Sequence, residues 1–105
     1  MKLSICVFFI GVTAFGVTLA QEYPSKPVRI VVPLAPGGIS DNIARTFAQK
    51  MSESGKGTFI VENRAGAGGN IASDYVAKAR PDGYTILLGT AATHGVNAAL
   101  YRNLP

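Results

Sequence analysis

Three short stretches rich in glycine and other small residues are the parts of this sequence most suited to binding chemistry. They are residues 35–40 (Ala-Pro-Gly-Gly-Ile-Ser), 65–69 (Ala-Gly-Ala-Gly-Gly) and 89–93 (Gly-Thr-Ala-Ala-Thr). Each precedes a segment with a helical pattern, and the first turn of a helix carries unpaired N–H donors and a partial positive charge. Because glycine allows close approach to the backbone, these loops favour binding of a carboxylate or phosphate; tight strand-to-helix geometry alone is the alternative.

Three polar side chains stand beside these loops. Asp41 follows the first loop, where a carboxylate facing the ligand would repel an anion, so we expect it to hold loop N–H groups and orient the site indirectly, or simply to cap the helix. His94, the single histidine, follows the third loop, either as a structural residue or as a ligand donor. Ser40, Asp41 and His94 could form a hydrolytic triad, but G-x-S-x-G is absent and Ser40 adjoins Asp41, which disfavours an enzyme.

The sequence lacks the signatures of several other kinds of site. Residues 66–71 begin like the dinucleotide fingerprint G-x-G-x-x-G, but Ile71 replaces its third glycine, and no G-x-x-x-x-G-K-[ST] phosphate loop exists. No cluster of metal ligands is present in the sequence. The charges are scattered and form no basic stripe for nucleic acid. We therefore expect no cofactor, no metal and no nucleic-acid partner.

The elements that must position the loops alternate along the chain. Residues 28–34, 58–63 and 84–88 are short apolar runs, which predict strands, and segments with helical periodicity follow each of them. The order β-α-β-α-β-α predicts an α/β fold with a parallel sheet and flanking helices. In such sheets ligands bind beyond the carboxyl ends of the strands, where all three loops would lie on one rim.

The first predicted helix has the clearest pattern. Ile43, Phe47 and Met51 are spaced by four, and with Ala44 and Ala48 alongside they form one apolar stripe. Ser40 or Asp41 is predicted to cap the helix start. The second helix is predicted to begin at Asn70, and residues 94–101 fit a short third one.

The first twenty residues read as a targeting segment. Lys2 precedes a run of apolar and small residues that ends at Ala20, which is typical of a secretory signal peptide and places the protein in the periplasm; a membrane anchor is the alternative. Cys6, the only cysteine, would leave with this segment, so no disulfide is expected. Residues 21–105 are then the folded part. Because no closing helix or strand pattern precedes Pro105, we expect a fragment or a truncated product.

Four motifs in order resemble one known family, the Bug receptors of tripartite tricarboxylate transporters. They are residues 23–38 with Asp41 and Arg45, residues 61–69 (Val-Glu-Asn-Arg, then the glycine loop), residues 77–90, and His94 with Asn97 and residues 100–105. The sequence departs from the family pattern at two places. Ala65 stands where the family usually has proline, which affects the stiffness of the loop, and residues 54–59 lack the Gly-Gln-Pro that usually leads into the second strand.

The resemblance implies a Venus-flytrap periplasmic binding protein of type II, not an enzyme, with residues 21–105 as the N-terminal part of lobe 1 and the second lobe absent. It implies a small carboxylate ligand, permease subunits as partners, and a monomer when complete. The ligand-binding residues that this resemblance implies are Gly37, Gly38, Ile39, Ser40, Gly68, Gly69, Thr90 and Ala91. Asp41 and His94 are added because they stand beside the glycine-rich loops. A secreted hydrolase-like enzyme and a periplasmic sensor for a signalling partner remain as alternative functions.

Overall fold

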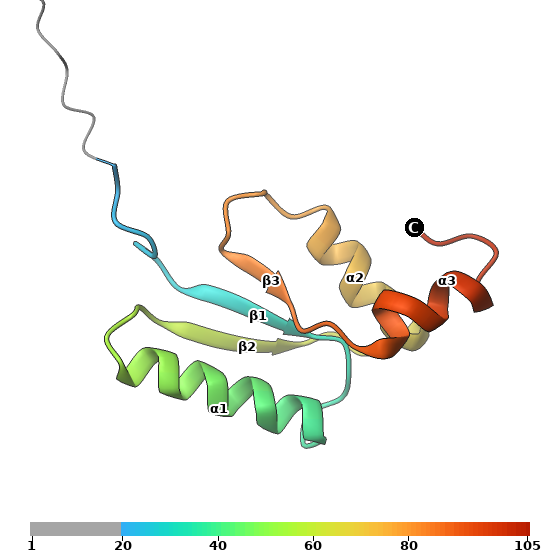
Figure 1. Cartoon of the computed structure of the whole chain (residues 1–105), viewed down its shortest axis with the longest axis horizontal. Helices are drawn as coiled ribbons and strands as arrows, with labels where there is room; N and C mark the ends of the chain where they lie inside the picture. Colours follow the sequence, from blue (N-terminus) through green and yellow to red (C-terminus); the bar gives the residue numbers. More distant parts are fainter. Residues whose placement is uncertain (1–19) are drawn as a thin grey trace, which may run out of the picture.

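The computed structural model describes residues 20–105 and contains a three-stranded sheet with helices around it (Figure 1). The strands are β1 (Val28–Val32), β2 (Phe59–Asn63) and β3 (Thr85–Leu87). The helices are α1 (Ile39–Glu53), α2 (Asn70–Ala77) and α3 (Asn97–Leu100), with short turns η1 (Ala67–Gly69) before α2 and η2 (Ala92–Val96) before α3. The predicted α/β fold with alternating elements is confirmed.

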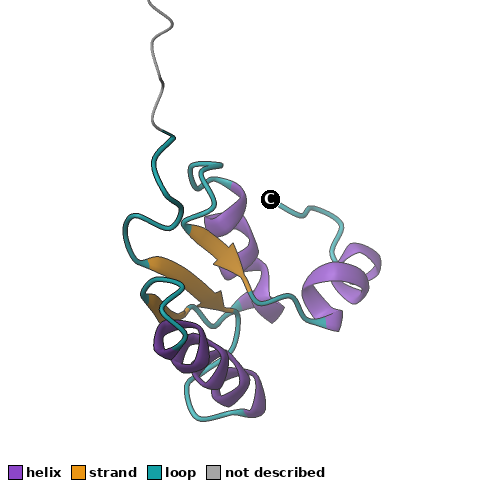
Figure 2. Ribbon diagram, turned by 60° about the vertical axis from the view of Figure 1, so that its left-hand side comes forward, coloured by secondary structure: helices purple, strands orange, loops and turns teal. Residues whose placement is uncertain are grey.

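All strand pairs are parallel, and β1 lies in the middle of the order β2-β1-β3. Val28, Val31 and Val32 of β1 are completely buried. Ile30 and Val32 pack with Ala44 and Ala48 of α1. Side chains alternate between the faces of a strand, so Arg29, whose Nη1 donates to the Tyr75 hydroxyl of α2 at 2.7 Å, points to the opposite face. The sheet therefore lies between α1 and α2 (Figure 2).

Helix α1 differs from its predicted form in two ways. Its buried face is Asp41, Ala44 and Ala48, because small residues let the helix lie close to the sheet, whereas Ile43 and Phe47 of the predicted stripe are half exposed. It also begins at Ile39 with Gly38 as its N-cap, and no side chain caps it. The prediction that Ser40 or Asp41 caps the helix was wrong, because both lie inside the first turn.

The strand order places the three loops together. The chain leaves β1 towards β2 and then returns across β1 to β3, so its direction reverses at the central strand. Since all strands are parallel, their carboxyl ends lie at one edge, and the loops after residues 32, 63 and 87 all start there. Such a reversal is where ligands bind in open α/β sheets. Figure 1 shows α3 at this same end of the strands.

The predicted signal peptide, residues 1–20, lies outside the described residues except for Ala20. Within residues 20–105, no helix has the length and apolar character needed to cross a membrane.

Candidate functional site

The three loops meet at Gly69. This glycine is buried, and a methyl group added to its Cα would lie 2.6 Å from Thr93 Cγ2 and 3.2 Å from Pro33 Cβ. Pro33 belongs to the first loop region and Thr93 to the third, while Gly69 ends the second. Gly69 thus lets the three loops come into contact, and its predicted role as a ligand contact stays a prediction.

Asp41 fixes the shape of the first loop. Its Oδ2 accepts hydrogen bonds from Gly37 N and Arg45 Nε, both at 2.9 Å, and its Oδ1 accepts from Asn63 Nδ2 at 2.9 Å. Asn63 also donates to Leu34 O at 3.1 Å, so the end of β2 is joined to the same loop. The expected hydrogen bond from a loop N–H to the Asp41 carboxylate is therefore present.

The surroundings of Asp41 keep it ionised. The hydrogen bond from Arg45, then those from Gly37 and Asn63, lower the pKa of the carboxyl from 3.8 to about 2. The same contact raises the pKa of Arg45. Because Arg45 neutralises the carboxylate within the network, Asp41 can hold the loop without presenting an unpaired negative charge to a ligand at the helix start.

The start of α1 presents free backbone donors. The Gly37 N–H is already bonded to Asp41, so it is not among them. The amides of Gly38, Ile39 and Ser40 follow, and none of them donates a hydrogen bond to another described residue. Ile39 and Ser40 lie in the first turn of a 15-residue helix, where the partial positive charge of the helix is concentrated. This arrangement suits one carboxylate group.

The second loop is held by α3. Asn97 is buried, and its Nδ2 donates to Gly68 O at 2.9 Å and to Asn70 Oδ1 at 2.7 Å. A methyl group on Gly68 would lie 3.1 Å from the Tyr101 hydroxyl. Neither Asn63 nor Asn97 was among the predicted site residues. The role of Asn97 could have been predicted from the sequence, because Thr93, Asn97 and Tyr101 are spaced by four and therefore lie on one face of a helix.

Ala67 in the second loop has a left-handed backbone, with φ at 47°. We predict that Ala67→Gly raises the free energy of unfolding by about 0.5–1 kcal/mol, because the strain at a left-handed alanine exceeds the entropy that glycine adds to the unfolded chain. Ala98→Gly in α3 is the matched control and should lower stability by about 0.5–1 kcal/mol. Urea denaturation measures both, and a loss of stability in Ala67→Gly would contradict the expectation.

Hydrogen bonds between Thr90 and Thr93 hold the third loop. Thr90 N donates to Thr93 Oγ1 at 2.9 Å, and Thr93 N donates to Thr90 Oγ1 at 3.2 Å, which makes a reciprocal cap before η2. Ala91, which follows Thr90, is exposed. His94 Nδ1 lies 2.7 Å from Thr93 Oγ1, and its ring covers Gly89. His94 thus holds this loop.

The residues of the hydrolytic alternative do not assemble. The Asp41 oxygens are bonded to Gly37, Arg45 and Asn63, and His94 Nδ1 is paired with Thr93. No hydrogen bond joins Ser40, Asp41 and His94 to one another among the described residues. The geometry favours binding over hydrolysis.

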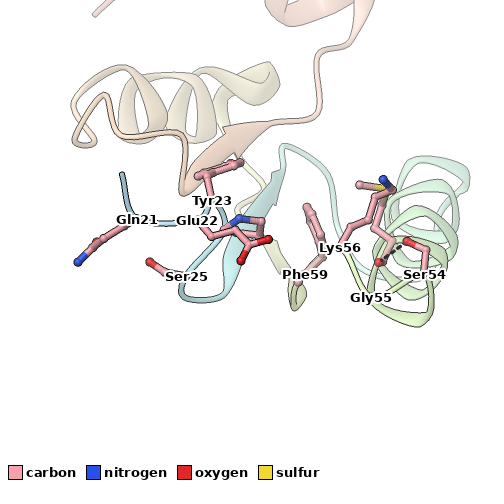
Figure 3. Close-up of a pocket in the computed structure, with 11 residues that line it drawn as sticks. Gln21, Glu22, Tyr23, Ser25, Ser54, Gly55, Lys56 and Phe59 are labelled. Atoms are coloured by element: carbon pink, nitrogen blue, oxygen red, sulfur yellow. Dashed lines mark hydrogen bonds between the residues drawn. The ribbon is translucent and has the colours of Figure 1, made fainter. Parts of the chain in front are cut away.

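A hollow of about 960 Å³ lies at the other end of the sheet, by the amino ends of the strands. It is lined by the segment 21–25 and by the turn between α1 and β2. Figure 3 shows Phe59 between Glu22 on one side and Lys56 on the other. Glu22 and Lys56 have opposite charges, and no helix within residues 20–105 begins at this end of the sheet, so the glycine-loop rim is the better site for an anion.

Comparison with known proteins identifies the family of this chain. The family described as "Tripartite tricarboxylate transporter family receptor" matches residues 43–105. The chain belongs to the tripartite tricarboxylate transporter receptor family. Similar solved proteins include the periplasmic binding protein BugD, and the family resemblance predicted from the four motifs is confirmed.

Three relatives of this receptor family member show how far the likeness extends. A UPF0065 protein of Bordetella pertussis is 48% identical over 86 residues, which are 82% of this chain and 27% of that protein. An R. palustris protein solved with adipate has a TM-score of 0.75 at 42% identity, covering 79% of this chain and 28% of its own. MatC from Rhodopseudomonas palustris with bound malate has a TM-score of 0.73 at 40% identity, and the match covers 78% of this chain and 28% of MatC. The chain thus spans about a quarter of each relative.

Proposed function

We propose that this chain forms the anion-binding part of a periplasmic receptor for a small dicarboxylate, with the first-turn amides of α1 as the main donors to one carboxylate group. The observation that carries the proposal is the set of unpaired amides at Gly38, Ile39 and Ser40, beside an Asp41 carboxylate that Arg45 neutralises. Gly68, Thr90 and Ala91 lie on the loops that complete the rim. The relatives solved with adipate and malate support a dicarboxylate as the ligand class.

The proposed receptor would act as a two-lobed protein in the periplasm. A ligand bound between two lobes favours the closed form, and permease subunits in the membrane would recognise that form for uptake. Residues 1–20 would direct export, and the complete receptor would be monomeric. This chain corresponds to about a quarter of the solved relatives, so it supplies only one wall of such a cleft. We therefore expect the chain alone to bind weakly, with a Kd of about 1 mM or above.

Replacing Ile39 by proline tests directly whether the backbone N–H of Ile39 donates a hydrogen bond to the ligand. Proline removes the N–H and is well accommodated at the first helical position, and Gly38 already has the extended conformation (φ −83°, ψ 178°) that proline requires before it. We expect Ile39→Pro to weaken adipate or malate binding at least about tenfold, because a hydrogen bond to a charged group contributes about 1.5–3 kcal/mol. Chemical shifts of backbone amides during a dicarboxylate titration measure the affinity.

The matched control is Ile39→Ala, which removes the exposed side chain but keeps the N–H, and which should bind within about twofold of the original chain. The neutral diamide of adipate should not shift the Gly38 and Ser40 amides. Equal affinity of Ile39→Pro and Ile39→Ala would count against the proposed donor. Dicarboxylate shifts confined to the opposite end of the sheet would count against the proposed site.

A further inference from the structure

The segment between the predicted signal peptide and β1 is fixed to the rest of the chain from Tyr23 onward. The Tyr23 hydroxyl donates to Gly83 O at 2.6 Å, and its ring centroid lies 5.1 Å from that of Tyr84. Ser25 N donates to the Tyr84 hydroxyl at 2.8 Å. The packed part of the described chain therefore begins at Tyr23, shortly after Gln21.

Gln21 lies outside these contacts. It is exposed, and it forms no hydrogen bond with another residue of the described part of the chain, 20–105. Although Gln21 borders the hollow of about 960 Å³, Figure 3 shows its side chain directed away from Phe59 and Lys56. The peptide bond between Ala20 and Gln21 is therefore open to a peptidase, and the Gln21 side chain is free to change its rotamer.

The place of Gln21 in the sequence gives it a particular chemistry. Thr18 and Ala20 are small residues at the two positions that a signal peptidase recognises, so cleavage after Ala20 would leave Gln21 as the first residue. A glutamine at the amino terminus carries a free α-amine that can reach its own side-chain amide in a five-membered ring. A glutamine inside the chain has no such amine, because its nitrogen belongs to a peptide bond.

We propose that Gln21 closes to a pyroglutamate once export has made it the first residue, an inference that rests on the export step of the proposed function. An α-amine is partly unprotonated near neutral pH, and its nitrogen attacks Cδ of the side-chain amide. The new N–Cδ bond forms the lactam ring and the bond from Cδ to Nε2 breaks. One proton passes from the α-amine to Nε2, which leaves as ammonia, so the reaction consumes no oxidant and no second substrate.

The modification changes the part of the mature chain that is most open to stepwise proteolysis. Chain termini without contacts are preferred sites of proteolysis, and an aminopeptidase needs a free α-amine to begin. The lactam nitrogen is neutral and offers no such amine. Since Tyr23 and Ser25 are already held against Gly83 and Tyr84, closing the ring at Gln21 blocks the short unfixed end that precedes them.

Mass spectrometry of the full chain, exported by a bacterial host and purified from the periplasm, tests the inference. We expect an intact mass about 17 Da below that of residues 21–105, which is the mass of the ammonia lost. Amines are then labelled by reductive methylation before digestion, so that cyclisation of peptides during preparation is not counted. The peptide 21–29 should carry no label at its first residue, whereas Lys26 in the same peptide should be labelled and shows that the reaction was complete.

Gln21→Glu is the matched control, because it keeps the length of the side chain but its carboxylate is a poor electrophile. This variant should retain a free, labelled α-amine. A mature product that begins with a labelled Gln21 would overturn the inference and leave the predicted signal peptide in place. A chain that is uncut, or cut at another bond, would overturn both the inference and the predicted cleavage site. Dicarboxylate binding at the first loop, at the opposite edge of the sheet, is measured separately and is unaffected by either outcome.

Discussion

Replacing Gly69 by alanine is expected to lower the free energy of unfolding by about 3 kcal/mol, the sum of two costs. The first is backbone strain, because Gly69 has φ at +92°, a conformation that costs an L-residue about 1–2 kcal/mol. The second is overpacking, because the new methyl group would lie 2.6 Å from Thr93 Cγ2 and 3.2 Å from Pro33 Cβ. Urea denaturation monitored by circular dichroism measures the loss.

Two control variants separate these costs. Gly55→Ala introduces strain alone, since φ is +73° but nothing lies within 4 Å of the new methyl group, and it should cost about 1 kcal/mol. Gly95→Ala introduces neither strain nor a close contact and should stabilise its helical segment by about 0.5–1 kcal/mol. A Gly69→Ala effect no larger than that of Gly55→Ala would show that the three loops do not meet at Gly69.

Replacing Asp41 by asparagine is expected to loosen the first loop and to remove a pH dependence of stability. The new amide keeps one acceptor oxygen but places an N–H₂ donor against the donors of Gly37 or Arg45. The urea midpoint at pH 7 should fall clearly, and hydrogen exchange of the Gly37 amide should become faster. Both measurements report on the loop that positions the Ile39 and Ser40 amides.

The sign of the pH effect follows from the pKa of Asp41. The pKa is about 2 in the folded chain and 3.8 for an unperturbed aspartate, so the stabilisation is fully present above pH 4 and is lost as the pH falls towards 2. The difference between the original chain and Asp41→Asn should therefore shrink between pH 4 and pH 2. A difference that is equal at pH 2 and pH 7 would contradict this origin.

Asp74→Asn is the matched control for Asp41→Asn. Asp74 pairs with Lys78 four residues later at 2.7 Å, the same spacing as Asp41 and Arg45, but the lysine side chain is 72% exposed. Its removal should cost no more than about 0.5 kcal/mol, because exposed pairs of this kind contribute little. The contrast would show that the hydrogen bonds to Gly37 and Asn63, and not the ion pair alone, make Asp41 important.

The site combines a rigid set of loops with a small number of unpaired amides. Asp41 and Asn63 hold the first loop, Asn97 holds the second, and the Thr90–Thr93 pair closes the third. Donors held in place before binding avoid the entropy loss of ordering a loop, which helps when the ligand is small. The same interactions explain why a rim built mainly from glycine and alanine keeps one shape.

The order of the strands and helices, and the edge of the sheet at which the glycine-rich loops lie, could be predicted from the sequence because both depend on local patterns. Apolar runs of five to seven residues are visible at 28–34, 58–63 and 84–88, each followed by a glycine-rich break, and parallel strands necessarily place the following loops at one edge. The link between Asp41 and the loop N–H was also within reach, since Gly37 is only four residues away.

Only the tertiary structure decided which face of α1 is buried and which amides are free. The predicted stripe placed Ile43 and Phe47 beside Ala44 and Ala48. Because the helix lies close to a sheet whose own valines fill the core, only the alanines of these four are buried. The partners of Asn63 and Asn97 are 18 to 29 residues away in the chain, and no local pattern shows such contacts. Long-range packing thus determined the details of the site and the buried face of α1.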